Sequence, residues 1–155
     1  MDLGGIKPDF SACAEVANEC IALRLRKAAR VVSRFYDRIL KQTGLNGNQF
    51  SLLVAIHLSE PVRVSDLVEL LLVERTVALR NLTRIEEQRL ITIVAGKDRR
   101  TRIVTLTSQG RRALSKALPR WRDAQARLSR ALNEEQWGPF MRGLSRVTTF
   151  AGERL

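Results

Sequence analysis

The chain has 155 residues, a length that suits one domain of ordinary size. Hydrophobic residues make up 45% and charged residues 28%, which excludes a disordered tail and a disulfide-dense miniprotein. The formal net charge is +11, because 27 Lys and Arg face only 16 Asp and Glu. A balance this basic favours a polyanionic partner, with nucleic acid ahead of a membrane surface.

The sequence contains no apolar run near the roughly 18–20 residues that a membrane span needs, and its first five residues lack the pattern of a signal peptide. We therefore expect a cytoplasmic protein whose two cysteines are free thiols. Two cysteines and one histidine are too few for a structural zinc site of four ligands, and no Gly-rich phosphate loop is present. We expect neither a metal nor a cofactor.

The positive charge is concentrated in two stretches. Residues 61–130 hold 16 Lys or Arg and 7 Asp or Glu, a local net charge of +9, and residues 20–41 have a net charge of +6. One explanation for these basic stretches is that they form helix faces exposed to solvent. Arginine outnumbers lysine by 22 to 5, which suits bidentate contacts to phosphate but also fits a GC-rich genome.

Two helices are predicted in the first third of the chain. The first begins near residues 10–15, and a stripe spaced by four and three residues places one apolar face along it, formed by Ile21, Leu25, Ala28, Val32, Phe35 and Ile39. Gly44 ends this element. Asn46 and Gln49 then form the signature of a capping box for a second helix that runs to about Leu58. His57, near its end, is interpreted as a packed, hydrogen-bonded residue.

A helix-turn-helix is predicted next. Pro61 opens a short extended link, Ser65 caps a brief helix over residues 66–71, and another helix begins near residues 74–75. On this last helix Ala78, Leu82 and Ile85 share the inner face. The spacing leaves polar and basic residues on the outer face: Arg75, Thr76, Arg80, Thr83 and Arg84.

The period then changes from helical to extended. Residues 91–95 and 102–106 are rich in β-branched side chains and predict two strands. The tip between them carries Lys97, Arg99 and Arg100, with Arg102 opening the second strand. A helix-turn-helix followed by a basic hairpin is a winged helix: its second helix fits the major groove of DNA, and an arginine of the hairpin can reach the minor groove.

Two further helices complete the prediction. Thr107 caps a long helix that contains Pro119, where we expect a kink, and Asn133 with Gln136 opens a last helix. The fold class is therefore mainly α with a small two-stranded β-wing.

Residues 45–112 resemble the MarR family of bacterial transcription regulators. The resemblance rests on Leu45–Phe50, on Arg75–Glu86 with Leu90-Ile91, on Asp98-Arg99-Arg100 in the wing, and on Leu106-Thr107-Ser108-Gln109-Gly110-Arg111 after it. The stretch Cys20–Leu40 also resembles the first helix of the family. Leu72 and Arg89 stand where many members carry glycine, the second at a site that often needs a left-handed backbone. Leu79 falls on or beside the groove-facing side, where polar residues are commoner.

The resemblance implies a homodimeric repressor on a pseudopalindromic operator in double-stranded DNA. Within a single domain of residues 1–155, residues 45–107 would form the DNA-binding lobe, and residues 10–42 and 108–155 the flanking dimerisation helices. Asp98 would brace the wing, Arg100 would enter the minor groove, and the outer face over residues 75–84 would belong to the recognition helix.

Two mechanisms could regulate binding to DNA, and the sequence leaves both as alternatives. Cys20 shares one helix side with Arg24 and Lys27, and nearby cations favour the thiolate. Its position in the first helix is also close to the one where the peroxide-sensing branch of the family has its reactive cysteine. Cys13 precedes Cys20 by seven residues. Burial as a small apolar side chain in a dimer interface is the alternative. The other switch is a small aromatic ligand, which Trp121, Trp137, Phe50 and Phe35 could surround, although such residues also build cores.

A sequence-tolerant architectural nucleic-acid binder is the competing function, because a net charge of +11 alone would serve it. A thiol enzyme would need a base beside its cysteine, and the one histidine lies on another helix. We therefore expect no enzymatic activity.

Overall fold

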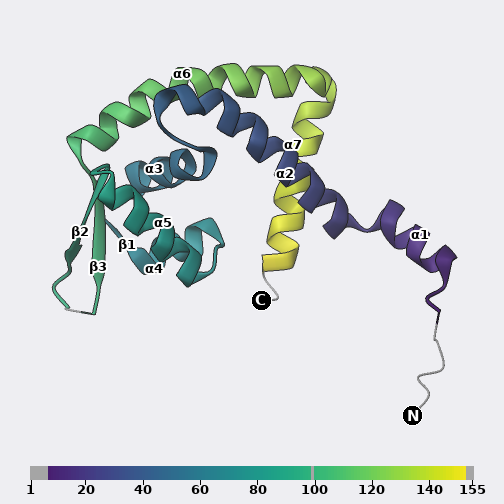
Figure 1. The fold of residues 1–155 in the computed structure, drawn as a ribbon, viewed down its shortest axis with the longest axis horizontal. Coiled ribbons are helices and arrows are strands. Elements are labelled where there is room, and N and C mark those ends of the chain that lie inside the picture. Colours follow the sequence, from purple (N-terminus) through teal and green to yellow (C-terminus); the bar gives the residue numbers. More distant parts are fainter. Residues whose placement is uncertain (1–6, 99, 153–155) are drawn as a thin grey trace, which may run out of the picture. The chain divides into compact units, whose positions relative to one another are not determined.

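The computed structural model describes residues 7–98 and 100–152 and contains helices and one small sheet (Figure 1). The helices are α1 (Phe10–Glu19), α2 (Ile21–Leu40), α3 (Gly47–Ser59), α4 (Val64–Leu71), α5 (Arg75–Glu87), α6 (Ser108–Ala131) and α7 (Asn133–Gly152), with a 3-10 turn η1 (Lys41–Thr43). The strands are β1 (Val62–Arg63), β2 (Ile91–Ala95) and β3 (Arg102–Leu106). The chain forms two compact units that meet within α2, one ending at Phe35 and the other beginning at Tyr36.

In the N-terminal unit the single predicted helix is two helices. Its start at Phe10 is confirmed, and Asp9 caps α1 by accepting a hydrogen bond from the Ser11 amide at 2.9 Å. Cys20 then takes an extended conformation, with ψ 108°, and breaks the helix. The Arg24 guanidinium donates to the Asn18 carbonyl at 2.7 Å, so a carbonyl near the end of α1 gains a side-chain partner. No pattern of apolar residues could show this break.

The second unit holds a continuous apolar core. Its largest fully buried side chains are Leu40, Leu53, Ile56, Leu67, Leu82, Ile85, Ile91 and Val104. They come from the end of α2, from α3, α4 and α5, and from both long strands, so helices on one side and the sheet on the other share one interior. The predicted inner face of α5 is confirmed, because Ala78, Leu82 and Ile85 are all buried.

The helix starts follow the predicted caps with one exception. Asn46 and Gln49 form both hydrogen bonds of a capping box at α3, and Thr107 accepts from the Gly110 amide at 2.9 Å at α6. The prediction for Ser65 is wrong. Its hydroxyl donates to the neighbouring Asp66 carboxylate, and α4 begins two residues earlier than predicted.

The two predicted strands have the predicted bounds and pair antiparallel, Ile91 opposite Leu106 and Ala95 opposite Arg102. A third strand, β1, pairs with the other side of β3 and was missed, so the sheet order is β1-β3-β2. Two residues are too few to show a period. Tertiary packing explains the pairing, since Val62 is buried opposite Val104.

Two positions where the family often has glycine are left-handed here. Leu72 has φ 49° and Arg89 has φ 58°. At the end of α5 the Arg89 amide donates to Glu86 and the Leu90 amide donates to Ile85, the two bonds of a Schellman motif. Leu72 and Val73 repeat this arrangement after α4. The expectation of a left-handed backbone at residue 89 is confirmed.

The last two helices are long. Pro119 lies inside α6, which continues as one helix to Ala131. Asn133, with φ 54°, accepts from the Gln136 amide at 3.0 Å, which is one of the two bonds of the capping box predicted for the start of α7.

Candidate nucleic-acid interface

An open groove of about 520 Å³ lies between the second helix of the helix-turn-helix and the hairpin. Three segments line it. They are the β1–α4 junction, the outer face of α5, and the wing between β2 and β3, and the side chains are Arg63, Val64, Ser65, Arg75, Leu79, Thr83, Arg100, Thr101 and Arg102. In Figure 1 the β2–β3 hairpin extends from near the start of α6 and runs beside α5, with which it lines the groove.

The face of α5 toward this groove is set by helical spacing. Arg75, Leu79 and Thr83 are four residues apart, so they form one row along the helix. Burial of Ala78, Leu82 and Ile85 in the core fixes the rotation of α5 and directs the row outward. Two predicted site residues, Arg75 and Thr83, are thus brought into the groove by the core.

The wing is shaped by its own backbone bonds. Gly96 donates to the Thr101 carbonyl at 2.8 Å, and the Thr101 amide donates to the Asp98 carbonyl at 2.8 Å. The Asp98 carboxylate accepts from the Arg100 amide at 3.0 Å. This bond holds the backbone of Arg100, whose side chain lines the groove. The predicted site residue Arg99 lies outside the described residues.

Sequence reasoning missed four groove residues, Arg63, Val64, Ser65 and Thr101. Arg63 lies on β1, opposite Ile103 of β3, and therefore beside the strand that carries Arg102. The basic excess over residues 61–130 included Arg63, but nothing in the local pattern could connect it with the wing. The pairing of β1 with β3 makes that connection.

Four arginines therefore surround one groove. No carboxylate is among the lining residues, and within residues 7–98 and 100–152 none of the four guanidinium groups forms an ion pair. Arginines that attract no internal partner repel one another, so their grouping disfavours an empty groove and favours an anion in it. Guanidinium groups bind phosphate oxygens in bidentate geometry, which makes a phosphate backbone the matching chemistry.

Comparison with known proteins identifies the family. Residues 43–101 match the model of the MarR family. A Bacillus anthracis protein named as an uncharacterized HTH-type transcriptional regulator is 32% identical over 117 residues, which are 75% of this chain and 78% of that protein. The structure of the M. tuberculosis transcriptional regulator MosR in complex with DNA is 36% identical and superimposes with a TM-score of 0.81, covering 87% of this chain and 98% of that one.

The chain belongs to the MarR family. A mutant of E. coli MarR complexed with operator DNA shares the fold, with a TM-score of 0.79 at 17% identity and coverage of 86% and 96%. The family is one of transcriptional regulators, and the mainly helical fold with its small antiparallel sheet is the winged-helix fold that the sequence predicted.

Other predicted site residues of this MarR-family chain lie beyond the groove. Thr76, Arg80 and Arg84 are exposed on α5 without lining it. They belong to the polar outer face of the helix, outside the groove.

Glu60, directly after α3, connects α3, β3 and α6 through its carboxylate. Its carboxylate accepts hydrogen bonds from both terminal nitrogens of Arg111 on α6 and from the Leu106 amide of β3 at 2.9 Å, and it contacts the His57 ring at 3.3 Å. Burial raises the pKa of Glu60, but the hydrogen bonds from Arg111, Leu106 and His57 and the charge of Arg111 outweigh it and hold the pKa below its ordinary value. His57 is hydrogen-bonded, as predicted, but the prediction that it is packed is wrong, because its side chain is 51% exposed.

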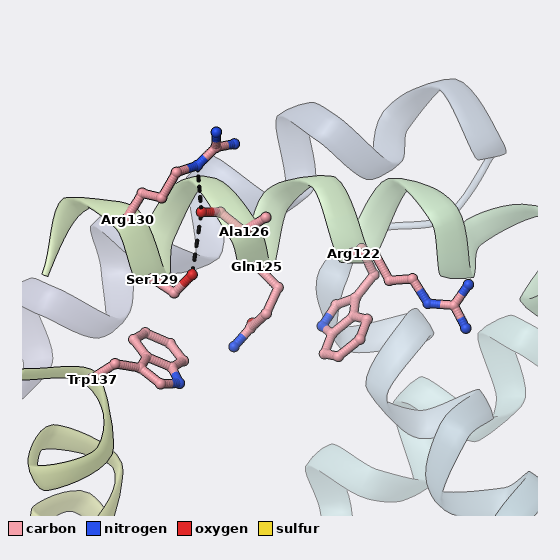
Figure 2. Close-up of a pocket in the computed structure, with 7 residues that line it drawn as sticks. Arg122, Gln125, Ala126, Ser129, Arg130 and Trp137 are labelled. Atoms are coloured by element: carbon pink, nitrogen blue, oxygen red, sulfur yellow. Dashed lines mark hydrogen bonds between the residues drawn. The ribbon is translucent and has the colours of Figure 1, made fainter. Parts of the chain in front are cut away.

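A cavity of about 410 Å³ lies between α6 and α7, lined by Trp121 and Trp137 among others. Figure 2 shows Gln125 on the same side of α6 as Trp137, whereas the Arg130 guanidinium is directed to the opposite side. Gln125 accepts from the Tyr36 hydroxyl at 2.5 Å, and burial raises the pKa of Tyr36. Phe50 is a core residue stacked on Trp121, with ring centroids 6.3 Å apart.

Neither thiol is among the residues that line the groove or the cavity. Cys13 is exposed on α1 and Cys20 is half-buried at the break between α1 and α2; both are free. Phe35 belongs to the same compact unit as the thiols. Among the described residues no group of three or more His, Cys, Asp or Glu is placed to hold a metal ion, and no helix there is both long and apolar enough to cross a membrane.

Proposed function

We propose that this chain is a cytoplasmic, homodimeric repressor that binds a pseudopalindromic operator in double-stranded DNA and is released by a small ligand or by cysteine oxidation. The groove lined by four arginines between α5 and the wing carries the proposal. It combines positive charge for phosphates with a helix face for the major groove.

The relatives support this partner. The MosR structure is a complex with DNA, and that of E. coli MarR is a complex with operator DNA. By the same placement, Arg75, Thr76, Arg80 and Thr83 would face base edges, Arg84 would lie nearer the phosphates, and Arg100 and Arg102 would hold the wing at the minor groove. Asp98 would act indirectly, because it fixes the Arg100 backbone.

Exposed apolar side chains support a homodimer. In the first unit Ile21 and Val31 of α2 are more than half exposed, and in the second unit Phe140, Met141 and Phe150 of α7 are exposed as well. Groups of exposed large apolar side chains are typical of interaction surfaces, and both sets of helices carry them. We assign residues 10–42 and 108–155 to dimerisation and residues 45–107 to the DNA-binding lobe within a single domain. Sedimentation should give twice the 17.5 kDa mass of the chain.

Two features support a switch. The cavity lined by Trp121 and Trp137 offers apolar ring faces beside polar residues that include Gln125, Arg122 and Arg130, which suits a small aromatic molecule. Cys20, at a helix break, offers a thiol whose oxidation would act on the local backbone. Either event would change the spacing of two recognition helices from the roughly 34 Å that adjacent half-sites require.

A gel-shift titration on the DNA upstream of the protein's own gene tests the proposal, with excess unrelated DNA as competitor. We expect one sequence to be preferred about 10³-fold or more. Equal affinity for all sequences would instead support an architectural binder.

Repeating the titration with hydroperoxide, then dithiothreitol, on the wild type and on Cys13→Ser and Cys20→Ser separates the thiol switch from a ligand switch. Binding that is indifferent to peroxide would exclude the thiol switch.

A further inference from the structure

Leu79 is an exception in the cationic groove. Two apolar side chains line it, and Val64 is buried whereas Leu79 remains 36% exposed. Leu79 lies one helical turn after Arg75 and one turn before Thr83, in the middle of the row on α5. A partly exposed apolar side chain among arginines forms no favourable interaction with water or with phosphate. A partner that is apolar at that point and anionic around it would match this arrangement.

The major groove of DNA has this combination. The C5-methyl group of thymine is the apolar feature among base edges that otherwise present hydrogen-bond donors and acceptors, and phosphates border the groove on both sides. If α5 docks with Arg75 and Thr83 toward the major groove of DNA, Leu79, which lies between them, also faces the base edges.

We propose that Leu79 contacts a thymine C5-methyl group, so that it selects A·T at one position of each half-site. This inference rests on the proposed function, because it assumes that α5 enters the major groove. It adds a specificity-determining contact made by an apolar residue, where the arginines supply charge.

Replacing thymine by deoxyuridine removes the methyl group and leaves base pairing intact, so it isolates this contact. Duplexes selected by the wild-type protein from a random library define the preferred site. Each thymine of that site is then replaced in turn by deoxyuridine, and the Kd is measured by fluorescence anisotropy. For the wild type we expect about a fourfold loss of affinity at one thymine of each half-site, as burial of one methyl group predicts.

Variants then assign the methyl effect to a residue. Leu79→Ala should bind the thymine and deoxyuridine duplexes with equal affinity, and Leu79→Met, which keeps an apolar side chain of similar size, should retain the preference. Leu58→Ala is the matched control, since Leu58 is 78% exposed at the end of α3 and does not line the groove. Circular dichroism melting checks that each variant folds.

The outcomes are distinguishable. Sequence-specific binding with no deoxyuridine effect, or with the same effect in Leu79→Ala as in the wild type, would overturn the inference and leave the proposed function standing. A selection that enriches no sequence would overturn both.

Discussion

The Leu90 carbonyl oxygen lies where Gly110 would carry a side chain: a Cβ on Gly110 would be 2.0 Å from that oxygen. The same oxygen accepts from the Thr107 amide and hydroxyl, each at 3.1 Å. The first turn of α6 is thereby packed directly on the residue that precedes β2. Thr107 caps the helix, and Gly110, three residues later, leaves room for the Leu90 carbonyl. The close packing of α6 on Leu90 therefore explains why a threonine and a glycine occur at this spacing.

Gly110→Ala should therefore destabilise the protein by about 1–3 kcal/mol, because a backbone oxygen cannot move aside as a flexible side chain can. Urea unfolding at fixed protein concentration measures the change. Gly143→Ala in α7 is the control: a Cβ there meets nothing within 4 Å, and alanine should stabilise the helix by about 0.5–1 kcal/mol. Unchanged stability of Gly110→Ala would contradict the close packing.

Glu60 should make the free energy of unfolding depend on pH in the acidic range. Its folded pKa is lowered, so the carboxylate contributes stability above the unfolded pKa, near 4.5, and that contribution is lost as the pH falls through the folded pKa. Glu60→Gln should cost about 1–3 kcal/mol at neutral pH, as expected for the loss of a charge-assisted hydrogen bond. Urea unfolding from pH 7 to pH 3 should show the two proteins converging in acid. A constant difference across this range would refute the role of the charge.

Arg89 should carry backbone strain. Arg89→Gly is expected to stabilise the protein by up to about 1 kcal/mol, because glycine adopts φ 58° without the steric cost that an L side chain incurs. Arg84→Gly, inside α5, is the matched control and should destabilise by about 1 kcal/mol. Thermal melting compares them, and similar destabilisation by both glycines would argue against strain at residue 89.

Arg63 and Arg100 should bind phosphates. Each change to alanine should weaken binding to all sequences alike and reduce the slope of log K against log salt by about 0.9 for every phosphate that the variant no longer neutralises. Anisotropy titrations over a range of salt concentrations measure the slope. Arg130→Ala, outside the groove, should leave it unchanged. If Arg63→Ala keeps the wild-type slope, β1 does not contribute to the interface.

Arg80 should act differently, as a reader of base edges. Arg80→Ala is expected to cost about 1–3 kcal/mol on the preferred site and far less on unrelated DNA. Competition titrations with both duplexes give the ratio of affinities. Equal losses on the two would make Arg80 a backbone contact.

The sequence by itself determined the winged-helix fold, the bounds of β2 and β3, the inner face of α5 and the caps at Asn46 and Thr107. These features are local: periodicity and capping depend on residues a few positions apart. The sequence did not predict the break at Cys20, the strand β1 or the start of α4, because apolar periodicity shows neither a side-chain bond to the backbone nor a tertiary pairing. Arg24 reaches back to Asn18 at the break, and β1 exists because Val62 pairs with Val104 across the core.

The same division holds for the candidate site. The sequence predicted Arg75, Thr83, Arg100 and Arg102, because helical spacing and a basic hairpin tip are visible in it. The same spacing placed Leu79 on or beside the groove-facing side. Only the tertiary structure added Arg63, since residues distant in sequence meet where β1 pairs with β3.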